Sequence, residues 1–292
     1  MRVRLFVYVG VMAAIFSLSN GTGSPPMASA QAKHTEEIAR LHQNILYPTV
    51  RVRAQRSVGS GTIVASIKNG DRYDTYVLTN HHVIENAIEI KEEWSPLLKA
   101  MVKKETRSTV EIEQFKYQHM SQATGTLLIL ADIVEWNMGH DLALIKLRSD
   151  DKFPTATLLP RGKESDLRIF QDVYVCGSGL GRSPFPTSGI VSSLVDEIDN
   201  QPYWMVSAPS VFGNSGGGCF LSATHEFIGI PSRIPVTWTS WSPNAVYHMA
   251  YVIPISRIYS WLYETGWGFL FDPSAPSREK WLADKKKGEN KP

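Results

Sequence analysis

This chain has little net charge, few cysteines and few long apolar runs. Its 292 residues carry 30 Lys and Arg against 28 Asp and Glu, a net charge of +2. This near balance gives no electrostatic basis for nucleic-acid binding, and it excludes nucleic acid as the main partner. The histidines, His119, His225 and His248 among them, show no metal-ligand spacing. We therefore expect no metal and no other cofactor.

The first thirty residues have the pattern of a secretory signal peptide. A basic start at Met1–Arg4 precedes an apolar run over residues 5–18, and Ala28-Ser29-Ala30 is a small-residue cleavage site. The apolar run is short, because a membrane span needs about 20 apolar residues. We expect export to the periplasm or the medium, with signal peptide 1–30 removed and no stable membrane span left. The alternative is a membrane anchor through an uncleaved N-terminal segment.

The rest of the chain divides into three parts by its patterning. Residues 31–47 are predicted to form a short helix that Pro48 ends, because Ile38, Leu41 and Ile45 fall on one face. Residues 48–265 are expected to form the main domain. The remaining residues, 266–292, are rich in proline and lysine and are predicted to be a mobile basic tail. Such a tail could touch an anionic surface.

Several segments of the main domain are typical of strands. Residues 49–53, 60–67 and 73–79 are predicted strands. The stretch between His82 and Asp141 is longer than a simple hairpin series requires and indicates an insertion over residues 86–135. Its elements are predicted as a helix at 94–104 and paired strands at 108–118 and 125–135.

Three motifs supply a histidine, an aspartate and a serine in that chain order. They are Thr79-Asn80-His81-His82-Val83, His140-Asp141-Leu142-Ala143 and Gly213-Asn214-Ser215-Gly216-Gly217. A serine hydroxyl is a poor nucleophile at neutral pH, so acyl-transfer enzymes place an imidazole against it and a buried carboxylate behind the imidazole. Glycines beside the serine permit a tight turn whose backbone N–H groups face the oxyanion. Gly213 and Ser215 are the expected donors of this oxyanion hole.

With these motifs the chain resembles the chymotrypsin-like (trypsin-like) serine peptidases, and most closely the HtrA/Deg protease domain. That branch favours T-N-x-H-V, D-L-A-x-x-K and G-N-S-G-G. The resemblance covers roughly residues 45–265 and implies His82 as general base, Asp141 as the group that orients it and Ser215 as nucleophile. His81 does not match the family position, and His140 is expected to be a surface or packing residue.

The resemblance also implies an all-β fold of two six-stranded antiparallel β-barrels with a C-terminal helix. The barrels are expected at about 48–148 and 167–255, with no room for a PDZ module after residue 265. Asn214 stands where digestive and clotting relatives have an aspartate that pairs with a newly freed N-terminal amine. Activation by that route is therefore not expected.

In the resembling enzymes the residue six before the nucleophile lies at the base of the specificity pocket, and here it is Pro209. Proline cannot select lysine or arginine. Residues 229–232, which end at Ser232, are expected to line the pocket, so a small or medium apolar side chain should be preferred. Relatives often carry a disulfide whose strands here hold Cys176 and Cys219. The resemblance thus implies a bridge, with two buried thiols as the alternative.

The expected function is that of an exported serine endopeptidase that cleaves polypeptides through an acyl-enzyme. Two alternatives remain open. One is a catalytically silent binding module on a protease fold, and the other is an esterase that uses the same triad.

Overall fold

The computed structural model describes residues 26–239 and 242–289, and most of the predicted signal peptide lies outside them. The chain separates into two units, residues 1–37 and 38–292. The first unit includes the beginning of helix α1 (Pro26–Leu41), in which residues 31–37 are exposed. This helix begins earlier than the predicted residue 31 and continues as a π-helical turn, η1 (His42–Leu46).

The second unit begins with a closed barrel of six antiparallel strands in the order β1-β2-β3-β8-β7-β6. Its interior is filled by alternating apolar side chains such as Val50, Val52, Ile63 and Ile145, all with no exposed surface. This alternation arises because successive side chains of a strand point to opposite faces. The strands are β1 (Thr49–Ala54), β2 (Ser57–Asn69), β3 (Arg72–Thr79), β6 (Val110–Gln118), β7 (Gln122–Asn137) and β8 (Leu142–Leu147).

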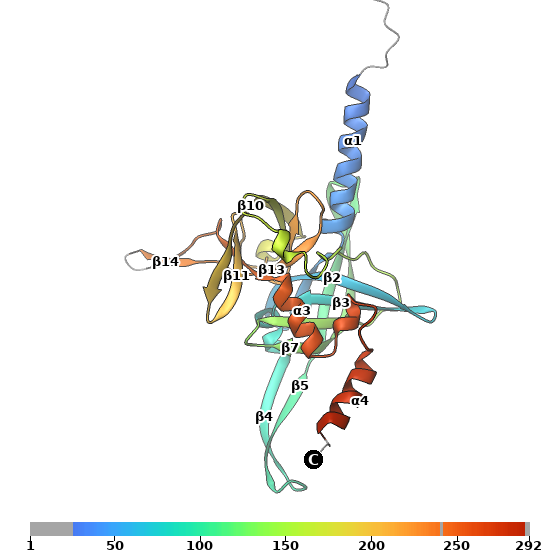
Figure 1. Cartoon of the computed structure of the whole chain (residues 1–292), viewed down its shortest axis with the longest axis vertical. Helices are drawn as coiled ribbons and strands as arrows, with labels where there is room; N and C mark the ends of the chain where they lie inside the picture. The colour runs from blue at the N-terminus through green and yellow to red at the C-terminus, as the bar shows by residue number, and fades with distance from the viewer. Residues whose placement is uncertain (1–25, 240–241, 290–292) are drawn as a thin grey trace, which may run out of the picture. The chain divides into compact units, whose positions relative to one another are not determined.

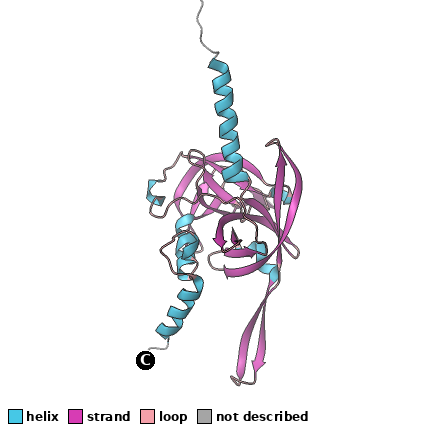
Figure 2. Cartoon of the chain, turned by 90° about the vertical axis from the view of Figure 1, so that its right-hand side faces the viewer, coloured by secondary structure: helices cyan, strands magenta, loops and turns pink. Residues whose placement is uncertain are grey.

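A second closed barrel of six antiparallel strands follows, in the order β10-β11-β16-β13-β12-β9. Phe220 and Phe227 pack edge to face inside it, with ring centroids 5.6 Å apart. The strands are β9 (Asp172–Gly177), β10 (Phe185–Ile198), β11 (Gln201–Val206), β12 (Gly218–Leu221), β13 (Phe227–Arg233) and β16 (Ala250–Pro254). The predicted fold class of two six-stranded barrels is confirmed, and Figure 2 shows the predominance of strand.

Two hairpins stand apart from the barrels: β4 (Ile88–Ser95) with β5 (Ala100–Arg107), and β14 (Val236–Thr239) with β15 (Ser242–Ala245). The predicted helix at 94–104 is wrong, because this stretch contains the turn between β4 and β5. Pro96 lies in that turn, and Lys99 has a left-handed φ of +48°. The paired strands expected at 108–118 and 125–135 are present as β6 and β7.

The helices of the second unit are short. The predicted C-terminal helix is present as α3 (Ile255–Glu264), whose buried face includes Ile258, Trp261 and Leu262. The chain does not become a mobile tail at residue 266, because Trp267 and Leu270 are buried in the hydrophobic core. The remaining helical segments are α2 (His81–Ile84), α4 (Arg278–Glu289), η2 (Glu85–Ala87), η3 (Glu164–Asp166), η4 (Gly179–Gly181) and η5 (Gly268–Leu270).

The first residue of helix α4 contacts the first barrel. Arg278 forms an ion pair with Glu135 of β7 at 3.0 Å, and its guanidinium lies 5.1 Å from the ring centre of Trp267. Among the described residues, the structure contains no helix with the length and apolar character needed to cross a bilayer.

Candidate active site

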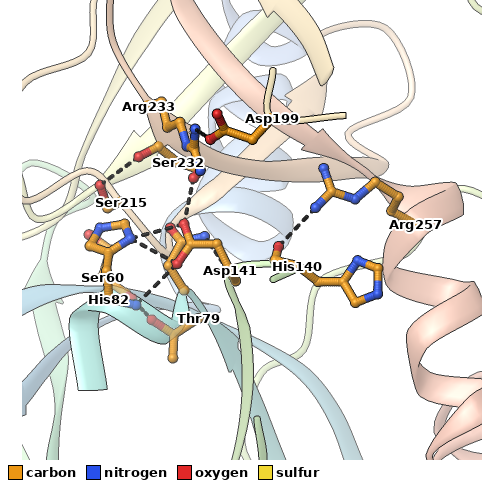
Figure 3. Close-up of polar contacts among 11 residues, drawn as sticks. Ser60, Thr79, His82, His140, Asp141, Asp199, Ser215, Ser232, Arg233 and Arg257 are labelled. Carbon is orange, nitrogen blue, oxygen red and sulfur yellow. Dashed lines mark hydrogen bonds and ion pairs between the residues drawn. The ribbon is translucent and has the colours of Figure 1, made fainter. Parts of the chain in front are cut away.

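The three motif residues come from three separate segments of the second unit. His82 lies in α2, directly after β3, and Asp141 closes the turn that precedes β8. Ser215 lies on the loop between β11 and β12. Figure 3 shows these three side chains together with Ser232 of β13. The structure therefore brings together residues that are far apart in the sequence.

His82 and Asp141 are joined by close polar contacts. The Nδ1 atom of His82 lies 2.9 Å and 3.0 Å from the two carboxylate oxygens, and the His82 backbone N–H donates to Asp141 Oδ1 at 3.1 Å. Asn80 donates its side-chain amide to the Asp141 carbonyl at 2.9 Å, which holds the same turn. Asp141 has a left-handed φ of +52°, a conformation that aspartate tolerates better than most residues.

Two opposing effects act on the pKa of the Asp141 carboxyl. Its burial raises the pKa, but hydrogen bonds from the His82 ring, the Ser232 hydroxyl and the His82 backbone N–H lower it more. The net pKa lies below the ordinary value of an aspartate. The carboxylate is thus ionised at neutral pH and able to orient the imidazole and stabilise its protonated form.

Ser215 and His82 line the same pocket, of about 380 Å³. The Ser215 hydroxyl donates to the carbonyl oxygen of Ser232 at 3.4 Å, and the described residues include no hydrogen bond between Ser215 and His82. In enzymes without substrate, the bond between a nucleophile and its base is often long and tightens only when substrate binds. The Ser215 hydroxyl and the His82 imidazole therefore both border this pocket.

The loop that carries Ser215 is held by Ser60 of β2. The Ser60 hydroxyl donates to the Gly213 carbonyl at 2.6 Å, and the Ser60 backbone N–H donates to the Ser215 carbonyl at 2.8 Å. Gly213 has φ +100° and Gly216 has φ +85°. A Cβ at position 216 would lie 2.1 Å from the Ser60 carbonyl oxygen, so only glycine is accommodated there.

The two expected oxyanion-hole donors belong to this loop. Within the described part of the chain, the backbone N–H groups of Gly213 and Ser215 have no hydrogen-bond acceptor. Their carbonyl groups, in contrast, are both bonded to Ser60. The two N–H groups are thus available to an acceptor that enters the pocket.

The pocket itself is mostly apolar, and it corrects one predicted residue. Pro209 is exposed and does not line it; its carbonyl accepts a hydrogen bond from Thr187 at 2.7 Å. The next residue, Ser210, is buried and lines the pocket. Ser232 is among the residues that line this pocket. The other lining residues are His82, Val211, Phe212, Asn214, Ser215, Pro231, Arg233, Ile234 and Val236.

Ser232 has a second role that the sequence did not indicate. Its hydroxyl donates to Asp141 Oδ2 at 2.6 Å, from a residue that is 8% exposed. The hydrogen bonds from Ser60 to the loop of Ser215 were not predicted either, because the sequence shows only that Ser60 lies in a Gly-Ser-Gly segment that resembles the family. For both serines, the one sequence signal was their position in a segment that resembles the family.

The implied disulfide is wrong, because Cys176 and Cys219 are both buried free thiols. They lie on the adjacent strands β9 and β12, but the register pairs Cys176 with Gly218 and Cys219 with Val175. A shift of one residue sends the two side chains to opposite faces of the sheet. Burial raises the pKa of each thiol to about 12.

Asn214 occupies an enclosed position directly before the nucleophile. Its side chain is 1% exposed, and among the described residues neither its Oδ1 nor its Nδ2 has a hydrogen-bond partner. A carboxylate in this place would need a cation to compensate its charge. The neutral amide is consistent with the expectation that no N-terminal amine is inserted here.

Comparison with known proteins now supports these observations. The family model of the trypsin-like peptidase domain matches residues 59–230, more than half of the chain. The chain belongs to this family. The match includes all three motif residues, His82, Asp141 and Ser215.

Curated relatives place the chain close to one branch. A probable periplasmic serine endoprotease, DegP-like, of Pseudomonas fluorescens is 30% identical over 187 residues, which is 63% of this chain and 31% of that protein. The protein with the same description in Ectopseudomonas mendocina is 29% identical over 215 residues, 73% of this chain and 36% of its own length. This chain spans about a third of the length of these relatives.

Proposed function

We propose that this chain is an exported serine endopeptidase that hydrolyses polypeptides through an acyl-enzyme. The observation that carries the proposal is the bonding of His82 to a buried, ionised Asp141 beside a pocket that also exposes Ser215. The names of the DegP-like relatives support both the reaction and the export.

The chemistry begins at the imidazole. With Nδ1–H donating to Asp141, the neutral ring of His82 carries its lone pair on Nε2. That nitrogen takes the proton of Ser215 as the hydroxyl oxygen attacks the scissile carbonyl carbon. The N–H groups of Gly213 and Ser215 hold the oxyanion of the tetrahedral intermediate. His82 then gives the proton to the leaving amine, and water repeats the sequence to release the acyl group.

The substrate preference follows from the pocket. Its walls include Val211, Phe212, Ile234 and Val236, with no acidic side chain among the lining residues. We expect it to accept small or medium apolar side chains at the residue before the cut and to disfavour lysine and arginine there. Unfolded polypeptides would present such residues most readily.

The test combines labelling and digestion. A fluorophosphonate should label the wild-type protein at Ser215, and unfolded casein should be cut mainly after apolar residues. Ser215→Ala should abolish the label and lower turnover by about six orders of magnitude, because the triad acts as a unit. Ser222→Ala, at a serine in the second barrel outside the pocket, serves as the matched control and should keep both.

The same experiment separates the alternatives. A folded protein that the fluorophosphonate does not label would be a silent binding module. A labelled protein that cleaves activated esters but leaves casein intact would be an esterase. Either result contradicts the proposed endopeptidase activity.

A further inference from the structure

The hairpin of β4 and β5 is almost entirely exposed. It belongs to neither barrel, and its strands pair only with each other, from Ile88 opposite Arg107 to Ser95 opposite Ala100. Most of its residues are exposed on both faces, so the hairpin contributes little to the core. Figure 1 shows it projecting from the first barrel. Isolated two-stranded hairpins are marginal in water, and this one is held at its base.

The free end of this hairpin is apolar. Trp94 is 60% exposed, Leu97 91%, Leu98 66% and Met101 57%. Trp94 and Met101 lie opposite each other in the strand pairing, which places both side chains on one face. Soluble proteins rarely place several large apolar side chains together in water unless they meet a partner. We call these four residues the hairpin tip.

Lysines accompany the hairpin tip. Lys99 lies in the turn between Leu98 and Met101, and Lys103 lies two residues beyond Met101 on β5. Among the described residues neither lysine forms an ion pair, although Glu92 lies opposite Lys103 in the strand pairing. Lys104 pairs with Glu93 at 3.2 Å, further from the turn. The end of the hairpin therefore combines apolar side chains with the positive charge of Lys99.

A second group of lysines lies at the same end of the unit. Helix α4 and the β4–β5 hairpin are both fixed to one stretch of β7, residues 133–136. Arg107 of the hairpin donates to the Ile133 carbonyl at 2.9 Å, and Trp136 donates to Glu105 at 2.9 Å. Arg278 of α4 pairs with Glu135. Figures 1 and 2, related by a turn about the vertical axis, show both elements extending downward from the barrels.

The outer part of α4 is basic. Lys280, Lys285, Lys286 and Lys287 are all exposed there, and Asp284 is the acidic residue among them, 4.0 Å from Lys287. A helix in water gains little from a run of adjacent lysines such as Lys285–Lys287, because like charges repel each other. An anionic surface below this end of the molecule would bind both groups of lysines.

We propose that this end of the protein docks on the surface of an anionic lipid membrane, with the hairpin tip inserted at the boundary between headgroups and acyl chains. Tryptophan favours that boundary, and leucine and methionine are accommodated just below it. Lys99, Lys103 and the lysines of α4 then meet the anionic headgroups, since long lysine side chains reach the headgroup level from an apolar setting.

The shape of the hairpin tip favours lipid over a protein partner. A narrow turn directs its four apolar side chains outward, and a fluid bilayer can surround such a projection without a preformed pocket. The nearby positive charge complements anionic lipid, whereas a second copy of this chain would oppose lysine to lysine. Docking of this kind is independent of peptidase activity, so Ser215→Ala protein should bind lipid as the wild type does.

The test follows the environment of one position in the full chain. Cys176 and Cys219 are fully buried, and burial raises the pKa of both thiols to about 12, so an introduced cysteine can be labelled selectively. Leu97→Cys is labelled with a polarity-sensitive fluorophore, and Val195→Cys, at an 89% exposed position in the second barrel, is the matched control. Each is titrated with neutral phosphatidylcholine vesicles and with vesicles containing about 30% phosphatidylglycerol.

We expect the label at position 97 to shift to shorter wavelength and brighten at least about twofold on anionic vesicles only, and the label at 195 to stay unchanged. Replacing Lys285, Lys286 and Lys287 by glutamine should weaken the response severalfold, as should about 0.5 M salt. A label at 97 that stays in water, or that responds equally to neutral vesicles, overturns the proposal. A fluorescence shift at position 97 that appears without vesicles when the protein concentration is raised also overturns the proposal, because it would indicate that a second copy of the chain covers the hairpin tip.

Discussion

The carbonyl oxygen of Phe212 accepts a hydrogen bond from the backbone N–H of Leu180 at 2.7 Å. Phe212 directly precedes Gly213, so this bond fixes the peptide that joins them. In a trans peptide the C=O and N–H groups point in opposite directions. With the carbonyl turned toward Leu180, the N–H of Gly213 points away from that loop, as an oxyanion donor must.

Removing the Leu180 donor should therefore weaken catalysis without touching the triad. Leu180→Pro deletes the N–H and cannot adopt the left-handed φ of +54° found there. We expect kcat/KM to fall by about 10²–10³, the cost of one oxyanion donor. Leu180→Gly is the matched control, because it keeps the N–H, tolerates positive φ and removes a side chain that is 71% exposed. A proline variant as active as the glycine variant would show that the peptide is oriented by other contacts.

Ser232→Ala tests the hydrogen bond to Asp141. The hydroxyl lies 2.6 Å from Oδ2, and bonds to charged groups contribute about 1.5–3 kcal/mol. We expect kcat to fall roughly tenfold to a hundredfold, measured on a peptide with a small apolar residue before the cut. This bond is also one cause of the lowered pKa of Asp141, so that pKa should rise in the variant. Ser232→Thr retains a hydroxyl and should recover part of the rate; an alanine variant with the wild-type kcat would contradict this role.

The sequence predicts the barrels well because their strands are buried on one face. The run at 49–53 alternates apolar and polar residues and forms β1, and the C-terminal helix that the resemblance implies is present as α3. The β4–β5 hairpin escaped prediction because it is exposed on both faces, so no alternation marks it. Burial of Trp267 depends on distant partners such as Tyr76, whose ring centre lies 5.6 Å away. No local pattern encodes that contact.

At the site, local motifs named the three candidate residues but not their hydrogen-bond partners. His82, Asp141 and Ser215 each stand in a recognisable segment, and the fold brings these segments together. The bond from Ser232 to Asp141 joins residues 91 positions apart, which no spacing rule predicts. Counting six residues back from Ser215 gave Pro209, but Ser210 is the residue that lines the pocket.

The cysteines give a prediction that follows from their pKa values. Burial raises the pKa of Cys176 and Cys219 to about 12, so at pH 8 only on the order of one thiol in 10⁴ is ionised. Native protein should resist iodoacetamide, also when it is purified from the compartment to which we propose it is exported. Denaturant without reductant should then yield two alkylated cysteines, counted by mass. Recovery of a linked peptide pair would show instead that the strands shift to form the bridge. Stability should also decline above about pH 9, because unfolded thiols ionise there while the buried ones stay neutral.

Arg257 connects the C-terminal helix to the turn that presents Asp141. This arginine is 7% exposed, and it donates to the carbonyl of Pro202 at 2.8 Å and to that of His140 at 3.0 Å. Its guanidinium also lies 4.9 Å from the ring centre of Tyr203. Arg257→Met keeps much of the side-chain volume but leaves two carbonyls without this donor, so we expect the free energy of unfolding to fall by about 2–4 kcal/mol.

The effect of Arg257→Met should extend to catalysis, since His140 directly precedes Asp141 and its carbonyl helps to hold a turn with left-handed backbone. Differential scanning calorimetry should show a melting temperature lower by roughly 5–10 °C, and kcat should fall at temperatures where the variant is still folded. Arg257→Lys retains the charge but can donate to fewer acceptors. Its melting temperature and kcat should therefore lie between those of the wild type and the methionine variant. If the methionine variant melts with the wild type and keeps its kcat, the turn is held by Asn80 and the Met138 carbonyl alone, and α3 has no part in placing the carboxylate.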